Sequence, residues 1–135
     1  MSGTEPVNGS EAEHSPYTEV MTEPSIFTKI LRGDIPADIV AQTENVFVLR
    51  DIAPQAPVHL LVIPKTEQHR DVAELAAADP ALLAEMIDCA QRMAAEHADG
   101  DFRLVFNSGA GAGQTVFHVH AHVLAGSLDE KSVGG

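Results

Sequence analysis

Apolar and polar positions along the chain repeat with two different periods, and each period predicts a different kind of element. After Pro80, apolar residues recur at intervals of three and four, which is typical of one face of an α-helix. Asp79 is a favoured N-cap residue, Pro80 suits the first helical position, and Asp99-Gly100 ends the segment. We therefore expect a long helix here, with Cys89 buried beside its core-facing stripe. That stripe is expected to consist of Leu82, Leu83, Met86, Ile87, Ala90, Met93 and Ala94.

Shorter apolar runs, bounded by proline, glycine or polar turns, predict strands elsewhere in the chain. The expected strands are Ile39–Gln42, Val46–Arg50, His59–Ile63, Phe102–Phe106 and Val116–Leu124. Two shorter helices are expected, one capped by Ser25 and running through Leu31 before Gly33, and one over 71–77. Strands grouped on both sides of helices favour an α+β fold with a mainly antiparallel sheet.

Composition and charge change this picture mainly at the N-terminus. Residues 1–24 are rich in Gly, Ser, Pro, Thr and Glu without any Lys or Arg, which predicts a disordered acidic tail. The formal net charge of the whole chain is -12, and such an acidic protein repels nucleic-acid polymers and anionic membranes. We expect a cytoplasmic protein, because the chain begins without a secretory signal and no apolar run approaches a membrane span.

Three of the chain's histidines, His118, His120 and His122, occupy alternate positions in the last expected strand. Successive side chains of a strand point to opposite faces, so these three would form a row on one face, roughly 6.6 Å apart. The opposite, core-facing side is expected to consist of Phe117, Val119, Ala121 and Val123. Such a row is typical either of a zinc site or of a nucleophile acting on phosphorus, and the spacing alone does not separate the two.

The segment before the histidines favours phosphate chemistry. Between Asn107 and Thr115, a glycine stands at every second position from 109 to 113, which allows tight turns and the close approach of a ligand. Exposed backbone N–H groups, the Thr115 hydroxyl and the Gln114 amide would surround phosphate oxygens. No Lys follows the last glycine, so this is not a Walker loop. A metal site needs no such loop, whereas phosphate chemistry does.

Several motifs together resemble the histidine triad (HIT) family, in its nucleotide-binding, phosphoramidase-like branch. The triad is His118-Val119-His120-Ala121-His122-Val123-Leu124. The other matching segments are Ser25–Ile30, Asp34–Ala37, Asp51–Pro57 and His59–Lys65. The resemblance implies one domain over 25–126, followed by a C-terminal tail over 127–135. It also implies a five-stranded sheet with two principal helices, and a homodimer that joins two sheets into a ten-strand arrangement through the long helix and a strand edge.

The activity that the resemblance implies is hydrolysis of purine nucleoside 5′-phosphoramidates or related AMP conjugates. His120 would attack the α-phosphorus and form a nucleotidyl-histidine that water hydrolyses, while a backbone carbonyl fixes its tautomer. His122 would donate to a phosphate oxygen, and His118 and His59 would support the array. A third triad residue that is His and not Gln favours hydrolysis over nucleotidyl transfer. Cleavage of dinucleoside polyphosphates and a non-catalytic nucleotide-binding module are the alternatives.

The same resemblance implies the binding residues by position. Asp51 would hold the ribose hydroxyls, and Ile26, Phe27 and Ile52 would form the wall for a purine base. Phosphate contacts are implied for Asn107, Gly113, Gln114, Thr115 and His122. Many bacterial relatives carry a Cys-x-x-Cys motif where this chain has Ser25 and Thr28, so we expect no bound metal and no cofactor. The C-terminal segment lacks the aromatic residue that shapes leaving-group choice in this branch, so the leaving group stays open.

Overall fold

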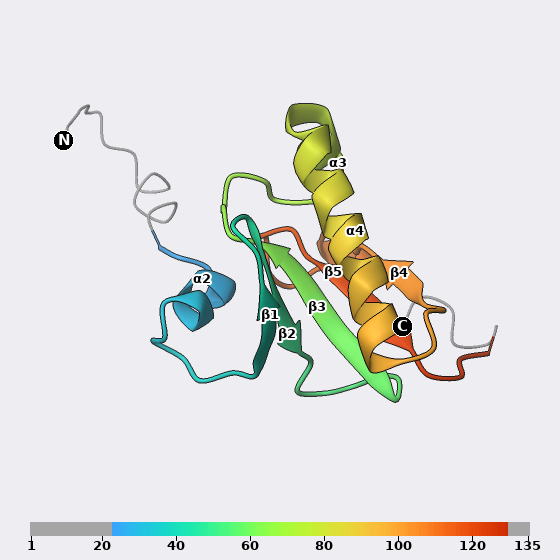
Figure 1. The fold of residues 1–135 in the computed structure, drawn as a ribbon. Helices are drawn as coiled ribbons and strands as arrows, with labels where there is room; N and C mark the ends of the chain where they lie inside the picture. The colour runs from blue at the N-terminus through green and yellow to red at the C-terminus, as the bar shows by residue number, and fades with distance from the viewer. Residues whose placement is uncertain (1–22, 130–135) are drawn as a thin grey trace, which may run out of the picture.

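A five-stranded antiparallel sheet with the strand order β1-β2-β3-β5-β4 organises the chain, which confirms the expected α+β fold. The computed structural model describes residues 23–129, so most of the predicted acidic tail and the last six residues lie outside it. The elements are α2 (Ile26–Leu31), β1 (Ile39–Gln42), β2 (Val46–Arg50), β3 (Val58–Pro64), α3 (Val72–Ala78), α4 (Pro80–His97), β4 (Arg103–Val105), the 3-10 turn η1 (Ala110–Ala112) and β5 (Ala121–Ala125). Figure 1 shows α4 lying across the sheet, while α2 lies beyond β1.

Two apolar clusters cover the two faces of the sheet. Val48 packs in the cluster that contains Met86 of α4, whereas its neighbour Phe47 packs in the cluster that contains Phe27 of α2. Successive strand residues alternate between faces, so β2 is buried on both sides. This explains why the segment 46–49 is a continuous apolar run and all four of its residues are buried.

The helices begin where their capping residues predict. The Ser25 side chain accepts a hydrogen bond from the N–H of Thr28 at 3.1 Å, and that of Asp79 accepts from the N–H of Leu82 at 3.1 Å. Cys89 is buried, as expected. The prediction for Ile87 is wrong, because this side chain lies on the outer face of α4 and is 40% exposed. Within residues 23–129, no helix is both long enough and apolar enough to cross a membrane.

The predicted histidine strand is shorter than expected, because β5 begins only at Ala121. The backbone before it is bonded to loops: the N–H of Val119 donates to the carbonyl of His69 at 3.0 Å, and the carbonyl of Val116 accepts from a glutamine side chain. The neighbouring strand β3 ends at Pro64, which has no N–H to extend the ladder. The core prediction is confirmed for Val119, Ala121 and Val123 and is wrong for Phe117, which is 47% exposed.

Candidate active site

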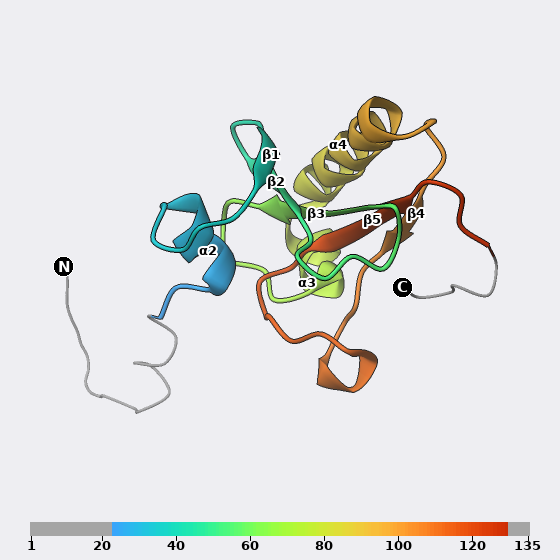
Figure 2. The same ribbon diagram turned by 90° about the horizontal axis from the view of Figure 1, so that it is seen from below.

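The three histidines meet where β5 begins, between α2, the end of β3 and the loop that carries η1. Figure 2 shows this loop projecting from the sheet just before β5. Only His122 lies within a strand, and His118 and His120 lie in the irregular segment before it. The rings are nevertheless close together, with the centroids of His120 and His122 5.4 Å apart. The ring of Phe27 packs steeply inclined to the rings of His118 and His120, so α2 forms one wall of the site.

His118 is a fully bonded, buried residue. Its Nε2 lies 2.7 Å from the carbonyl oxygen of Pro64, which can only accept, so Nε2 carries the hydrogen. Its Nδ1 therefore accepts from the Ser25 hydroxyl, 2.6 Å away. Burial lowers the pKa of His118 below its ordinary value, which keeps the ring neutral. With both nitrogens occupied, His118 ties the start of α2 to the end of β3 and cannot act as a nucleophile.

His120 has one nitrogen bonded and one free. Its Nδ1 lies 2.9 Å from the carbonyl oxygen of His118, so Nδ1 carries the hydrogen and Nε2 presents a lone pair. Within residues 23–129, no hydrogen bond reaches that Nε2. Burial lowers the pKa of His120, so the ring is neutral near pH 7. These are the two properties that a nitrogen nucleophile needs.

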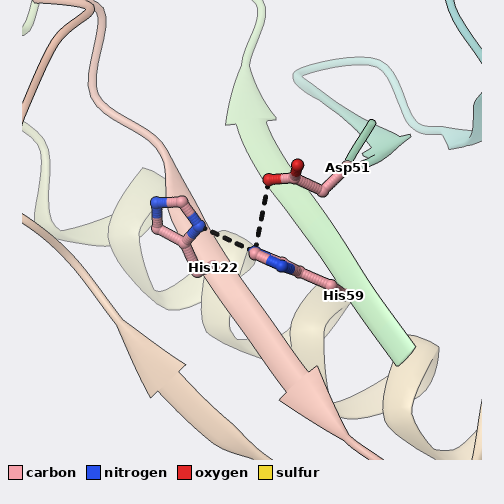
Figure 3. Close-up of side chains that lie close together, drawn as sticks. All are labelled: Asp51, His59 and His122. Atoms are coloured by element: carbon pink, nitrogen blue, oxygen red, sulfur yellow. Dashed lines mark hydrogen bonds and ion pairs between the residues drawn. The ribbon is translucent and has the colours of Figure 1, made fainter. Parts of the chain in front are cut away.

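His122 is held by a chain of hydrogen bonds that starts on the backbone. The N–H of Gln55 donates to Nδ1 of His59 at 3.0 Å, so the hydrogen of the neutral His59 ring is on Nε2. That Nε2 lies 2.9 Å from Nδ1 of His122 and 3.3 Å from Oδ2 of Asp51 (Figure 3). His122 Nδ1 is then the acceptor, and its Nε2–H is left to donate to a ligand. Burial, with the neighbouring rings of His120 and His59, lowers the pKa of His122 to about 4.

Distance alone would also allow a metal at this cluster, because ligand atoms of Asp51, His59 and His122 lie within 4.8 Å of one another. The directions of the hydrogen bonds at these residues do not suit a bound metal ion. A metal-bound histidine normally donates its other ring N–H to an acceptor. Here Nδ1 of His59 faces the donor N–H of Gln55, so the nitrogen that faces the cluster is the protonated one. The geometry therefore favours hydrogen bonding over metal ligation.

The glycine-rich loop is shaped by Gln114, whose side chain differs from the expectation. Gln114 is buried; its Oε1 accepts from the N–H of Gly109 at 2.8 Å, and its Nε2 donates to the carbonyls of Arg70 and Val116 at 2.7 and 3.0 Å. The amide therefore braces the loop and has no hydrogen left for a phosphate. The N–H groups of Gly113 and Gln114 also bond within the loop.

The other predicted substrate-binding residues differ in how exposed they are. Thr115 is exposed and Asn107 is half-buried. Phe27 is buried against the histidines, whereas Ile26 is 45% exposed and Ile52, next to Asp51, is 96% exposed. Exposed apolar side chains at these two positions are compatible with a wall that a base would cover.

Sequence reasoning missed three supports of the site. The carbonyl of Pro64 and the N–H of Gln55 set two histidine tautomers, but backbone groups carry no signal in residue type. The third is the Ser25 hydroxyl, which was identified only as a helix cap. Its place at the first position of the Cys-x-x-Cys segment was the available signal that it also contacts a site residue.

Comparison with known proteins agrees with this geometry. Residues 32–128 match the HIT domain. A purine nucleoside phosphoramidase of Escherichia coli is 41% identical over 108 residues, which cover 78% of this chain and 90% of that protein. An uncharacterised HIT-like protein of Synechocystis is 47% identical over 110 residues, which cover 78% of this chain and 93% of that protein.

Solved structures give the same result. A HIT family hydrolase of Clostridium thermocellum superposes with a TM-score of 0.72 at 37% identity, covering 78% of this chain and 92% of that one. A HIT family hydrolase of Legionella pneumophila superposes with a TM-score of 0.72 at 39% identity, covering 78% of this chain and 95% of that one. The family match spans most of the chain, and these relatives are well above 30% identical. The chain therefore belongs to the HIT family.

Proposed function

We propose that this protein hydrolyses purine nucleoside 5′-phosphoramidates, or related AMP conjugates, through a nucleotide bound covalently to His120. The observation that carries the proposal is the hydrogen bond from Nδ1 of His120 to the carbonyl of His118, which leaves a neutral Nε2 available. The name of the E. coli relative, a purine nucleoside phosphoramidase, supports the substrate class.

The reaction has two displacements at one phosphorus. In the first, Nε2 of His120 forms a bond to phosphorus, the P–N bond to the amine breaks, and the leaving nitrogen takes up a proton. In the second, water attacks phosphorus, loses a proton, and releases the nucleoside monophosphate and the imidazole. His122, through its Nε2–H, would stabilise the charge on the phosphoryl oxygens in both steps.

Around this centre we assign the remaining roles as follows. Asp51 binds the ribose, Ile26, Phe27 and Ile52 form the base wall, and Thr115 with Asn107 contacts phosphate oxygens. Gly113 and Gln114 shape the loop that holds them.

The direct test is turnover of adenosine 5′-phosphoramidate by the purified protein and by His120→Ala. We expect the variant to lose at least about a thousandfold in kcat, since it has no nucleophile. His97→Ala is the matched control, because this histidine lies at the far end of α4 and should leave the rate unchanged. Quenching with a denaturant at alkaline pH, where the P–N bond of a nucleotidyl-histidine is stable, should trap a nucleotide on the wild-type chain alone. Equal rates for wild type and His120→Ala would refute the proposal.

Turnover of diadenosine polyphosphates, measured in parallel, tests the alternative activity, which is cleavage of dinucleoside polyphosphates. Faster turnover of these compounds would assign the protein to polyphosphate cleavage. Binding of AMP without turnover of either substrate class would indicate a nucleotide-binding module.

We also propose that two copies assemble through α4 and the β4 edge. Within the described residues, β4 pairs only with β5, and Ile87 is exposed on the outer face of α4. Pairing of two β4 edges would extend the five strands to ten. Sedimentation should give a dimer, and Ile87→Glu should shift it toward the monomer.

A further inference from the structure

Asp51, the proposed ribose-binding residue, also lies next to the hydrogen-bonded pair His59 and His122. Its Oδ2 lies 3.3 Å from Nε2 of His59, and its Oδ1 accepts from the N–H of Ala53 at 2.8 Å. The side chains of Asp51 and His59 are 16% and 4% exposed. The carboxylate is thus turned inward toward the two rings, as Figure 3 shows.

We propose that Asp51 is a positioning residue for His122 and acts on it through His59. The single Nε2–H of His59 faces two acceptors, Nδ1 of His122 and Oδ2 of Asp51. Attraction to the carboxylate holds the His59 ring with this hydrogen pointing into the cluster. His122 then keeps Nδ1 as its acceptor and Nε2 as its donor. The inference rests on the function proposed above, because it assigns that Nε2–H to the substrate phosphate.

One carboxylate would therefore serve both nucleoside recognition and the orientation of a catalytic hydrogen bond. A ribose hydroxyl that donates to Asp51 takes part of its charge, and the His59 hydrogen is then shared less with Asp51 and more with His122. Interactions that strengthen a transition-state contact raise kcat, whereas uniform binding lowers only KM. The ribose hydroxyls should consequently contribute to kcat.

The test uses a substrate that has no hydroxyl for Asp51 to bind, 2′,3′-dideoxyadenosine 5′-phosphoramidate, with the variant Asp51→Asn. Asn can keep an oxygen for the N–H of Ala53, but it places an NH₂ group opposite the His59 Nε2–H, where two donors repel. A role in ribose binding alone predicts equal kcat for wild type and variant on this substrate. We expect kcat to fall by roughly tenfold or more, with KM changed little, because a donor to the phosphoryl group is misplaced. Equal kcat overturns the inference.

Two further variants control the experiment. Asp34→Asn makes the same charge change at an exposed position after α2, where the carboxylate pairs with Arg32, and should leave kcat unchanged. In a His59→Gln background, Asp51→Asn should cause little additional loss, since the proposed route runs through His59. Losses that add fully would mean that Asp51 acts independently of His59 and would contradict the inference.

A measurement that needs no turnover separates this inference from the proposed function. Nitrogen-15 NMR of the histidine rings reports which nitrogen of His122 carries the hydrogen. We expect Nε2–H in the wild type and a mixture of tautomers in Asp51→Asn. An unchanged tautomer overturns the positioning role, even if phosphoramidates are hydrolysed. Absence of wild-type turnover on adenosine 5′-phosphoramidate overturns the function, while a shifted tautomer would still support the positioning role.

Discussion

The two ends of the histidine row are built differently. At one end, His118 is 1% exposed and both of its ring nitrogens are bonded, to Ser25 and to Pro64. At the other end, His122 and His59 share one hydrogen beside a carboxylate. The first end holds the chain in place. The second end determines where a hydrogen atom lies, and its bonds can redistribute when a ligand arrives.

The proposed nucleophile depends on both ends. His120 takes its tautomer from the carbonyl of His118, in the fixed region, and its ring packs against His122, in the region that can change. Substitutions at the two ends should therefore separate stability from activity.

Of the two ends, the changeable one should have the larger effect on activity. His122→Ala removes the proposed donor to the phosphoryl oxygens, so kcat should fall by about a hundredfold or more. The free energy of unfolding should change little, because the ring is half-buried and one of its nitrogens faces the ligand side. Steady-state kinetics and urea denaturation on the same samples check both expectations. A large loss of unfolding free energy with a small loss of kcat would show that His122 supports the fold more than the activity, contrary to this comparison.

Substitution at the fixed end should mainly lower the stability of the fold. His118→Ala removes a buried ring with two hydrogen bonds, so the free energy of unfolding should fall by about 2–4 kcal/mol. Denaturant unfolding measures this difference. A change below about 1 kcal/mol, the worth of one ordinary hydrogen bond, would show that His118 does not hold the fold together.

A smaller loss is expected from the partner of His118. Ser25→Ala removes both the cap of α2 and the hydroxyl that donates to Nδ1, so stability should fall by about 1–2 kcal/mol. Ser108→Ala, at an exposed position, serves as the control and should be neutral. Equal thermal midpoints for the two variants would contradict the bond to His118.

The stability of the changeable end should also depend on pH. The pKa of His122 is lowered from 6.5 to about 4 in the folded chain, so the unfolded chain binds more protons between these values. The free energy of unfolding should therefore fall as the pH drops from about 6.5 toward 4, and it should be fully retained above 6.5. Denaturation series at several pH values measure the slope, which should be smaller in His122→Asn. An unchanged slope in that variant would assign the effect to other groups.

Local sequence patterns were sufficient where an element is determined by its own residues. Asp79 and Pro80 define the start of α4, and the strands β1 and β2 lie at the predicted residues. The segment 116–120 could not be predicted, because its backbone partners, His69 and the Gln114 side chain, come from outside any strand pattern. The three histidines were expected to meet through strand alternation, but the structure brings them together mainly through loop contacts.

Motifs indicated which residues of the candidate site lie together, but they did not indicate how these residues are hydrogen-bonded. His120 and Asp51 were named from their positions in a family pattern, and the structure places both near His122. The tautomers could not be predicted, since they depend on the backbone groups of Pro64 and Gln55.

The bracing of the glycine-rich loop by Gln114 has a consequence for the kinetics of binding. A flexible glycine loop would lose conformational entropy when it closed on a nucleotide. Here Gly109, Arg70 and Val116 already hold the amide at three points, so the loop is preorganised. Association should then be a single fast step, without a slow rearrangement of the protein after the first encounter.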